Sequence, residues 1–163
     1  MSKKLLLAVL GLIVIVLIVF RADLLSVVNP GRRARILVSE AQSRLITYPF
    51  IGPRTGEFFW YRSTPENDLI RVRQITVFGW KITAQNLIAE DNSKIDNKIH
   101  EFLISQGFRP DPYNATAAIT ISADGYLKNN LACLKTSRLT ENAKAAEKQL
   151  FAIELICGLL PAD

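Results

Sequence analysis

The chain begins with one long apolar run among its first residues. Leu5 to Phe20 has the sequence LLLAVLGLIVIVLIVF, with Lys3 and Lys4 before it and Arg21 after it. At about 1.5 Å per residue, sixteen residues of helix cover roughly 24 Å, and snorkelling basic flanks extend this toward the ~30 Å hydrocarbon core of a bilayer. We therefore expect a single transmembrane helix that anchors the chain through residues 1–30.

A cleaved secretory signal is the alternative interpretation of this run. Both classes have a basic start and an apolar core, but cleavage needs small residues at two alternate positions. Phe20 and Arg21 stand where small residues are required, which favours a retained signal anchor. Basic residues on both sides leave the positive-inside rule undecided. The short basic leader and the two cysteines favour a cytoplasmic N-terminus and an extracytoplasmic C-terminal domain.

Three later stretches repeat apolar residues at spacings of three and four, which predicts amphipathic helices. They are residues 33–46, about 93–107 and about 141–157. The first helix could rest on a membrane surface or on the folded domain, and the domain is the commoner choice. In the second, Asn92 or Ser93 is the expected N-cap, Gly107 an expected stop, and Phe108 an expected apolar contact with the last turn.

Strand character is strongest between residues 69 and 82, where β-branched and aromatic residues predict one or two strands. Prolines and glycines punctuate residues 48–66, which indicates a loop and a short strand. Residues 118–123 and 126–134 flank Asp124–Gly125, which predicts a hairpin with its turn at that dipeptide. The expected fold is α+β: the transmembrane helix, then a small antiparallel sheet with helices packed on one face.

The length of 163 residues fits one folded domain and an appendage. We expect a membrane anchor at 1–30, an Arg-rich amphipathic helix and aromatic loop at 31–66, and an α+β core domain at 67–163. The net charge of +5 includes the basic residues that flank the apolar run, so a nucleic-acid partner is not expected.

Arginine is concentrated in the part of the chain nearest the expected membrane. Between Gly31 and Arg73 there are eight arginines, no lysine and four acidic residues. Guanidinium groups bind phosphates and carboxylates in a bidentate way, so the cluster could hold an anionic lipid or polymer, and a solvated basic face is the alternative. The candidate contacts for an anion are Arg32, Arg33, Arg35 and Arg44.

Aromatic residues gather in the same region and have two interpretations. Arginine and aromatic side chains together are common at recognition surfaces, whereas an isolated aromatic cluster more often packs in a core, which we favour. The candidate partner surface consists of Arg54, Phe58, Phe59, Trp60, Tyr61 and Arg62.

Cys133 and Cys157 are the two cysteines of the chain. Cys133 falls on a predicted strand and Cys157 on the apolar stripe of the predicted last helix, so both are expected to point toward the helix–sheet interface. A disulfide there would stabilise the fold by about 3 to 4 kcal/mol in the chain-entropy model. Two reduced, buried cysteines are the equally weighted alternative. Without a CxxC motif and with one histidine, a zinc site is not expected.

Residues suited to catalysis are sparse. His100 has no evident nucleophile as a partner, Glu90 and Asp91 suit the dipole of the helix that follows, and no glycine-rich phosphate loop is present. We expect neither a cofactor nor enzyme activity, with a hydrolase using His100 or a carboxylate as a remote alternative. The leading hypothesis is a non-enzymatic, membrane-anchored envelope protein whose domain binds a partner protein, for example within a larger assembly. The alternative is a module that binds anionic lipid or polymer through its Arg-rich segment.

Overall fold

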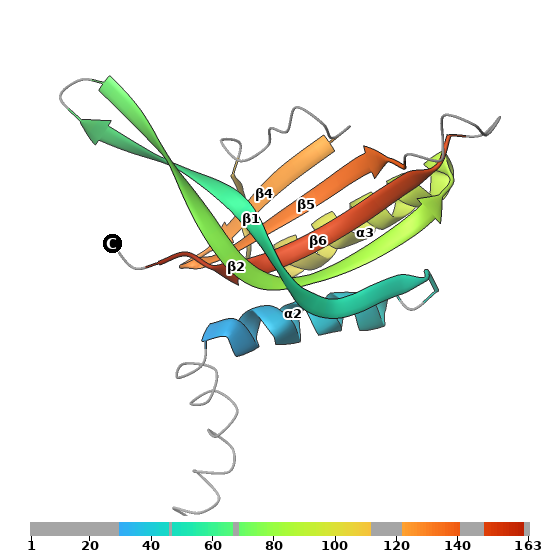
Figure 1. The fold of residues 1–163 in the computed structure, drawn as a ribbon. Helices are drawn as coiled ribbons and strands as arrows, with labels where there is room; N and C mark the ends of the chain where they lie inside the picture. Colours follow the sequence, from blue (N-terminus) through green and yellow to red (C-terminus); the bar gives the residue numbers. More distant parts are fainter. Residues whose placement is uncertain (1–29, 46, 67–68, 112–121, 141–148, 162–163) are drawn as a thin grey trace, which may run out of the picture.

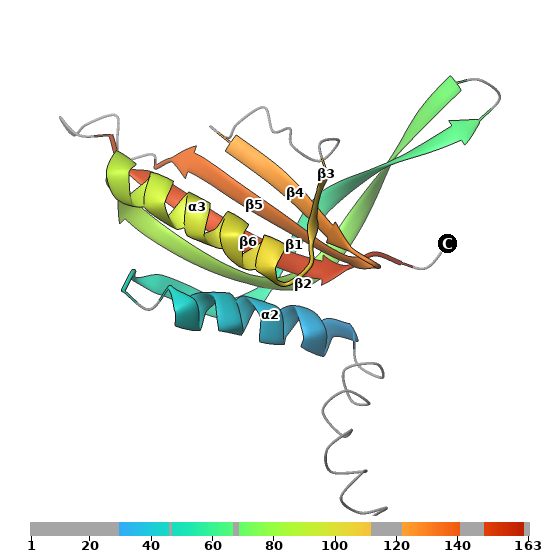
Figure 2. The ribbon, with the colours of Figure 1, turned by 180° about the vertical axis from the view of Figure 1, so that it is seen from behind.

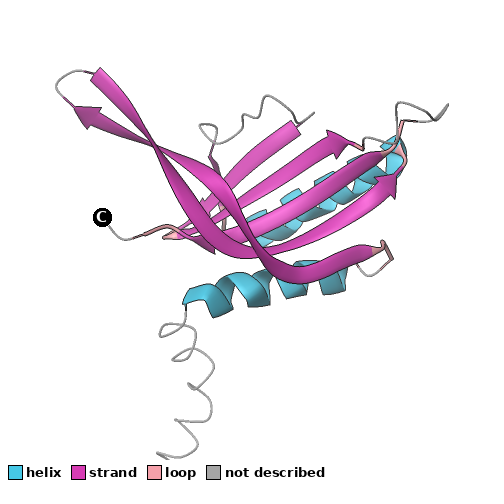
Figure 3. Ribbon diagram, viewed as in Figure 1, coloured by secondary structure: helices cyan, strands magenta, loops and turns pink. Residues whose placement is uncertain are grey.

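The computed structural model describes residues 30–45, 47–66, 69–111, 122–140 and 149–161. Its elements, in chain order, are α2 (Pro30–Arg44), β1 (Phe50–Glu66), β2 (Leu69–Leu87), α3 (Ala89–Ser105), β3 (Arg109–Asp111), β4 (Ser122–Lys128), β5 (Leu131–Leu139) and β6 (Phe151–Leu159). The strands form one antiparallel sheet in the order β1-β2-β6-β5-β4-β3. Both helices lie against the same face of the sheet (Figure 1 and Figure 3).

The main core lies between these helices and the sheet (Figure 2). The predicted helix at 33–46 is confirmed as α2, and its apolar stripe is buried on the sheet, so this stripe is not available to a membrane surface. The buried residues of this stripe are Ala34, Leu37, Val38, Ala41 and Leu45. Those of α3 are Ile95, Ile99, Phe102 and Leu103.

The end of α3 agrees with its sequence, whereas its start does not. Gly107 has a φ of +80°, and the N–H of Phe108 donates to the carbonyl of Leu103 at 3.0 Å, as in a Schellman motif. Phe108 is buried beneath the last turn, as predicted. The expected N-cap at Asn92 or Ser93 is wrong because the helix begins about one turn earlier, at Ala89, with acidic residues in its first turn.

The predicted C-terminal helix is also wrong. Phe151–Leu159 forms β6, in the middle of the sheet between β2 and β5, while residues 141–148 lie outside the described part of the chain. Because β6 is covered on both faces, nearly every position is apolar. A fully apolar strand satisfies helical spacing as well as strand spacing, which explains the error.

The hairpins differ from the predicted ones in length and position. Residues 50–66 form the long strand β1 where a loop and a short strand were expected, and the strand accommodates Pro53 at a register irregularity near its start. The tight turn falls at Asn129–Asn130, where Asn129 has a φ of 55°, a conformation that asparagine tolerates. Asp124–Gly125 lies inside β4 instead.

The predicted fold class therefore needs correction. The sheet is not small, since it has six strands and β2 alone has 19 residues, and one predicted helix is its central strand. Among the helices of the described ranges, none is long and apolar enough to cross a membrane. The run Leu5–Phe20, which carried the transmembrane prediction, lies outside those ranges.

Candidate functional site

The distal halves of β1 and β2 form a hairpin arm, defined here as residues 57–66 and 69–78. Strand β2 pairs with β6 only from Gly79 onward, so in the described part of the chain the arm strands pair only with each other. Figure 1 shows the arm extending beyond the other strands. A two-stranded ribbon is only marginally stable alone in water, so the packing of its two faces decides whether it is held in place.

The inner face of the arm is packed against the sheet. Trp60 is 1% exposed, and its ring meets that of Phe58 edge-on, with the ring centroids 6.3 Å apart. These two rings belong to a second apolar cluster on the sheet face away from the helices. Its buried members are Phe58, Trp60, Val77, Ala132, Ile156 and Leu160. This cluster fixes the base of the arm.

The outer face of the arm exposes large apolar side chains. Phe59 is 52% exposed, Phe78 is 74% exposed, and Val72 is 59% exposed. Phe78 stands opposite Glu57, and Phe59 stands opposite Thr76. The two phenylalanines are therefore diagonal neighbours on one face, a distance that aromatic rings can span. Exposed apolar groups gathered in this way mark interaction surfaces, so the outer face of the arm is the candidate interface.

The structure divides the partner surface that was expected from the sequence. All six of its residues lie on β1, but Phe58 and Trp60 point into the second cluster, whereas Arg54 and Phe59 are exposed. Tyr61 and Arg62 are partly buried, and both make interactions. Phe78 was missed because it becomes a neighbour of Phe59 only through cross-strand pairing, and Val72 lies farther along the same face of the arm. Strict alternation along a paired hairpin is the signal that could have found them.

The four arginines of α2 do not form a single contact surface for an anion. The guanidinium carbon of Arg35 lies 4.7 Å from the centroid of the Trp80 ring. Arg44 is on the other flank of the helix, where it pairs with Glu40 at 2.9 Å and lies over Phe102. Arg32 and Arg33 are exposed near the start of the helix. The expected basic cluster is thus spread around α2.

A cleft of about 620 Å³ lies between α3 and strands β3 to β5, and it contains a buried lysine. Lys135, on β5, is 2% exposed, and its ammonium group donates to Asp96 Oδ2 at 2.7 Å and lies 2.9 Å from Asp124 Oδ2. Burial acts to lower the pKa of Lys135, but the two carboxylates outweigh it and leave the pKa above its ordinary value. The lysine is therefore charged, and its charge is compensated locally.

His100 lines the same cleft and contacts one tyrosine. Its Nδ1 lies 2.8 Å from the hydroxyl of Tyr126, which is buried, and burial raises the pKa of that hydroxyl. Asp96 Oδ1 is buried without a hydrogen-bond partner among the described residues, so it can accept a bond from a small ligand or water. In the described ranges no three potential ligands gather around a metal position. The cleft thus contains hydrogen-bonding groups, His100, Tyr126 and Asp96, beside an ammonium group whose charge is already compensated.

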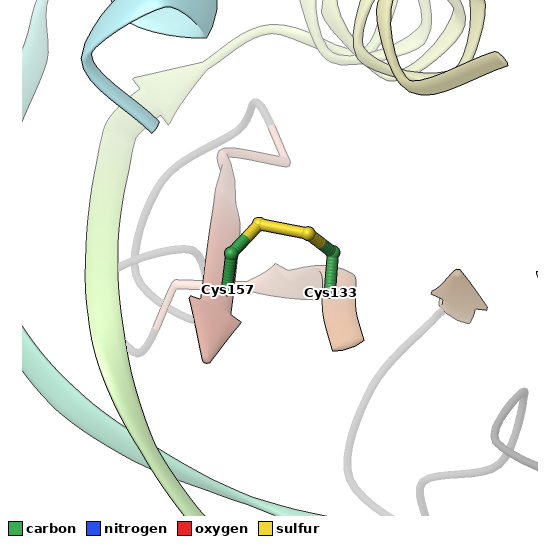
Figure 4. Close-up of a disulfide and its surroundings, with 2 residues drawn as sticks. All are labelled: Cys133 and Cys157. Atoms are coloured by element: carbon green, nitrogen blue, oxygen red, sulfur yellow. A yellow bond between two sulfur atoms is a disulfide. The ribbon is translucent and has the colours of Figure 1, made fainter. Parts of the chain in front are cut away.

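Cys133 and Cys157 form a disulfide between β5 and β6 (Figure 4). The two residues are directly opposite in the strand register, with their Cα atoms 4.1 Å apart, and neither is exposed to solvent. They lie on the helix-covered face, within the main core. Of the two alternatives for the cysteines, the structure contains the disulfide. Cys157, however, lies on strand β6 and not on the predicted helix.

Comparisons of the chain with protein-family models, curated proteins and solved structures found no match.

Proposed function

We propose that this chain is a non-enzymatic, membrane-anchored envelope protein whose domain binds a partner protein through the outer face of the hairpin arm. The exposure of Phe59 and Phe78, 52% and 74%, carries the proposal. Aromatic side chains dominate the energetics of protein interfaces because each can bury about 150–250 Å² at a small cost in conformational entropy. Two adjacent exposed rings therefore form a suitable centre for an interface.

The packing of the arm supports the same proposal. Trp60 and its neighbours hold the inner face, so the outer face is presented in a defined orientation and loses little freedom on binding. Strand β1 is also an edge strand, with β2 as its one strand neighbour in the described ranges. A partner strand could add to this edge while its side chains cover the phenylalanines.

The disulfide and the apolar run support the proposed location. A buried disulfide suits an oxidising compartment, which supports a position of the domain outside the cytoplasm. The run Leu5–Phe20 then attaches the chain to the membrane, with the N-terminus on the cytoplasmic side. The partner is therefore sought among envelope proteins or as a second copy of this chain.

Photo-crosslinking in intact membranes tests the proposal. A photoreactive amino acid replaces Phe78 in the full chain, and a matched variant carries it at Ser93, which is exposed on α3. We expect a discrete crosslinked product from position 78 that weakens when Phe59→Ser is added, and none from position 93. A product of twice the chain mass would identify a second copy as the partner. No product from position 78, or the same products from both positions, would contradict the proposal.

A further inference from the structure

A second groove, of about 510 Å³, lies where the first half of α2 faces the end of α3 and the turn between β4 and β5. Two cations from different elements line it, Arg33 of α2 and Lys128 of β4. Its apolar lining includes Ile36, which is 50% exposed, and Phe108. The groove thus combines a basic rim with an apolar floor.

Lys128 is held in position at this groove. Its ammonium group donates to the carbonyl oxygen of Gln106 at 2.6 Å, just beyond the last residue of α3. A cation is favourable at the C-terminal end of a helix, which fixes the side chain there. Because an ammonium group has three N–H donors, two remain for another acceptor.

The other polar groups of the groove also favour an anion. Glu40 is the carboxylate of the lining, and its charge is compensated by Arg44 at 2.9 Å. Arg33 and Lys128 therefore leave an excess of positive charge. The side chains of Asn129 and Asn130, at the tight turn, add amide N–H donors. A phosphodiester fits this set, because guanidinium and ammonium groups are its usual partners.

The groove also lies beside the start of α2, the described element that comes nearest to the apolar run in the sequence. Pro30 begins α2, and Arg33 follows within one helical turn. Only residues 21–29 separate α2 from the run, and nine residues span at most roughly 30 Å. We propose that the groove binds the headgroup of an anionic phospholipid, with Arg33 and Lys128 on the phosphate and the apolar floor against the first carbons of the lipid. This inference rests on the membrane attachment in the proposed function, but not on the arm.

Titration of the full chain with a soluble lipid tests the inference. The protein, labelled with ¹⁵N and kept in neutral detergent micelles, is titrated with dihexanoyl phosphatidylglycerol, and the side-chain amide signals of Asn129 and Asn130 are followed. We expect saturable shifts in the wild type and about tenfold or weaker affinity in the double variant R33Q/K128Q. The control R73Q/R138Q removes the same charge from exposed positions outside the groove and should bind as the wild type does.

Several outcomes would overturn the inference. One is equal weakening in both double variants, which would indicate unspecific attraction. Others are equal shifts with dihexanoyl phosphatidylcholine, or binding of inorganic phosphate as tight as that of the lipid. The absence of any saturable shift would also contradict the inference, and it is the result expected if residues 24–28 of the chain itself occupied the groove. If loss of the Gln106 contact unfolds R33Q/K128Q, two single variants replace it. Arg33→Gln should then bind the lipid more weakly than the wild type, and Lys128→Arg should retain the affinity of the wild type. Crosslinking from position 78 is independent of all these results.

Discussion

Lys135 Nζ lies 2.7 Å from Asp96 Oδ2, and this contact joins the central part of β5 to the middle of α3. Lys135 is 2% exposed, whereas the side chain of Asp96 is 27% exposed and that of Asp124 is 44% exposed. One cation therefore compensates two carboxylates that still reach water. Such an arrangement gains little net Coulomb energy over the cost of desolvation, whereas removal of one partner leaves charge uncompensated.

Replacement of Lys135 should destabilise the fold. Lys135→Met leaves two carboxylates facing each other without a cation, and partial hydration limits the loss to about 2–3 kcal/mol of unfolding free energy. Denaturant unfolding of the full chain in neutral detergent, followed by tryptophan fluorescence, measures it. Arg138→Met, an exposed change on the same strand, should stay within about 0.5 kcal/mol. Equal stability of the two variants would show that the ion pairs contribute nothing.

Stability should fall at alkaline pH. Burial raises the pKa of Tyr126 above its ordinary value of 10.0. Burial acts to lower the pKa of Lys135, but the hydrogen bonds that its ammonium group donates to Asp96 and Asp124 outweigh this and raise the pKa above its ordinary value of 10.5. Between about pH 7 and 9 both groups keep their protons in both states, so their contribution is constant. Above about pH 10 the unfolded chain loses these protons first, so the unfolding free energy declines as the pH rises through the folded-state values.

Unfolding at pH 8, 10 and 11 checks this expectation. The double variant K135M/Y126F removes both titrating groups, so its unfolding free energy should decline less steeply than that of the wild type. Parallel curves for the two proteins would assign the alkaline loss to other residues.

Loss of the disulfide should lower the unfolding free energy by more than the replacement of Lys135 does. Cys133 and Cys157 are 24 residues apart in the sequence, and release of a loop of this size costs about 3.5 kcal/mol in the chain-entropy model. We expect this loss in the double variant C133A/C157A. In the wild type, neither sulfur should react with a thiol reagent until the protein is both unfolded and reduced, because both are fully buried. Labelling of the native, unreduced protein would contradict the disulfide.

Substitutions on the two faces of the arm should affect different properties, stability on the inner face and partner binding on the outer face. Trp60→Ala removes a fully buried ring and should cost about 3–5 kcal/mol of unfolding free energy. Phe78→Ser changes a side chain that is 74% exposed, and should alter stability by about 0.5 kcal/mol or less while it weakens partner binding. Thermal unfolding of both variants, and crosslinking from a photoreactive amino acid placed at position 59 of each, separate the two effects. A large loss of stability in Phe78→Ser would mean that its ring packs within the fold.

Sequence patterns identified the helices that have one buried face. The stripes of α2 and α3 have the period of 3.6 residues that burial on one side requires, and Gly107 supplies a helix stop with a clear chemical cause. Strand β6 is buried on both sides, so its pattern has no period that could tell it from a helix.

The candidate sites were harder to predict because they depend on pairing between distant segments. Lys135 carries no sequence signal of burial, since its partners Asp96 and Asp124 come from a helix and a neighbouring strand. The groove likewise joins Arg33 to Lys128 through the packing of α2 against the β4–β5 turn. The aromatic segment of β1 was noticed, but its division into buried and exposed residues follows from the register with β2.

The position of β6 also determines when the sheet can close during synthesis. Strands β1 and β2 pair locally, as do β3, β4 and β5, and in the described ranges these two groups are joined through β6. Until residues 151–159 leave the ribosome, β2 and β5 each present an open edge to solvent. Closure of the sheet and oxidation of the cysteines therefore become possible only with the arrival of this strand, which carries Cys157.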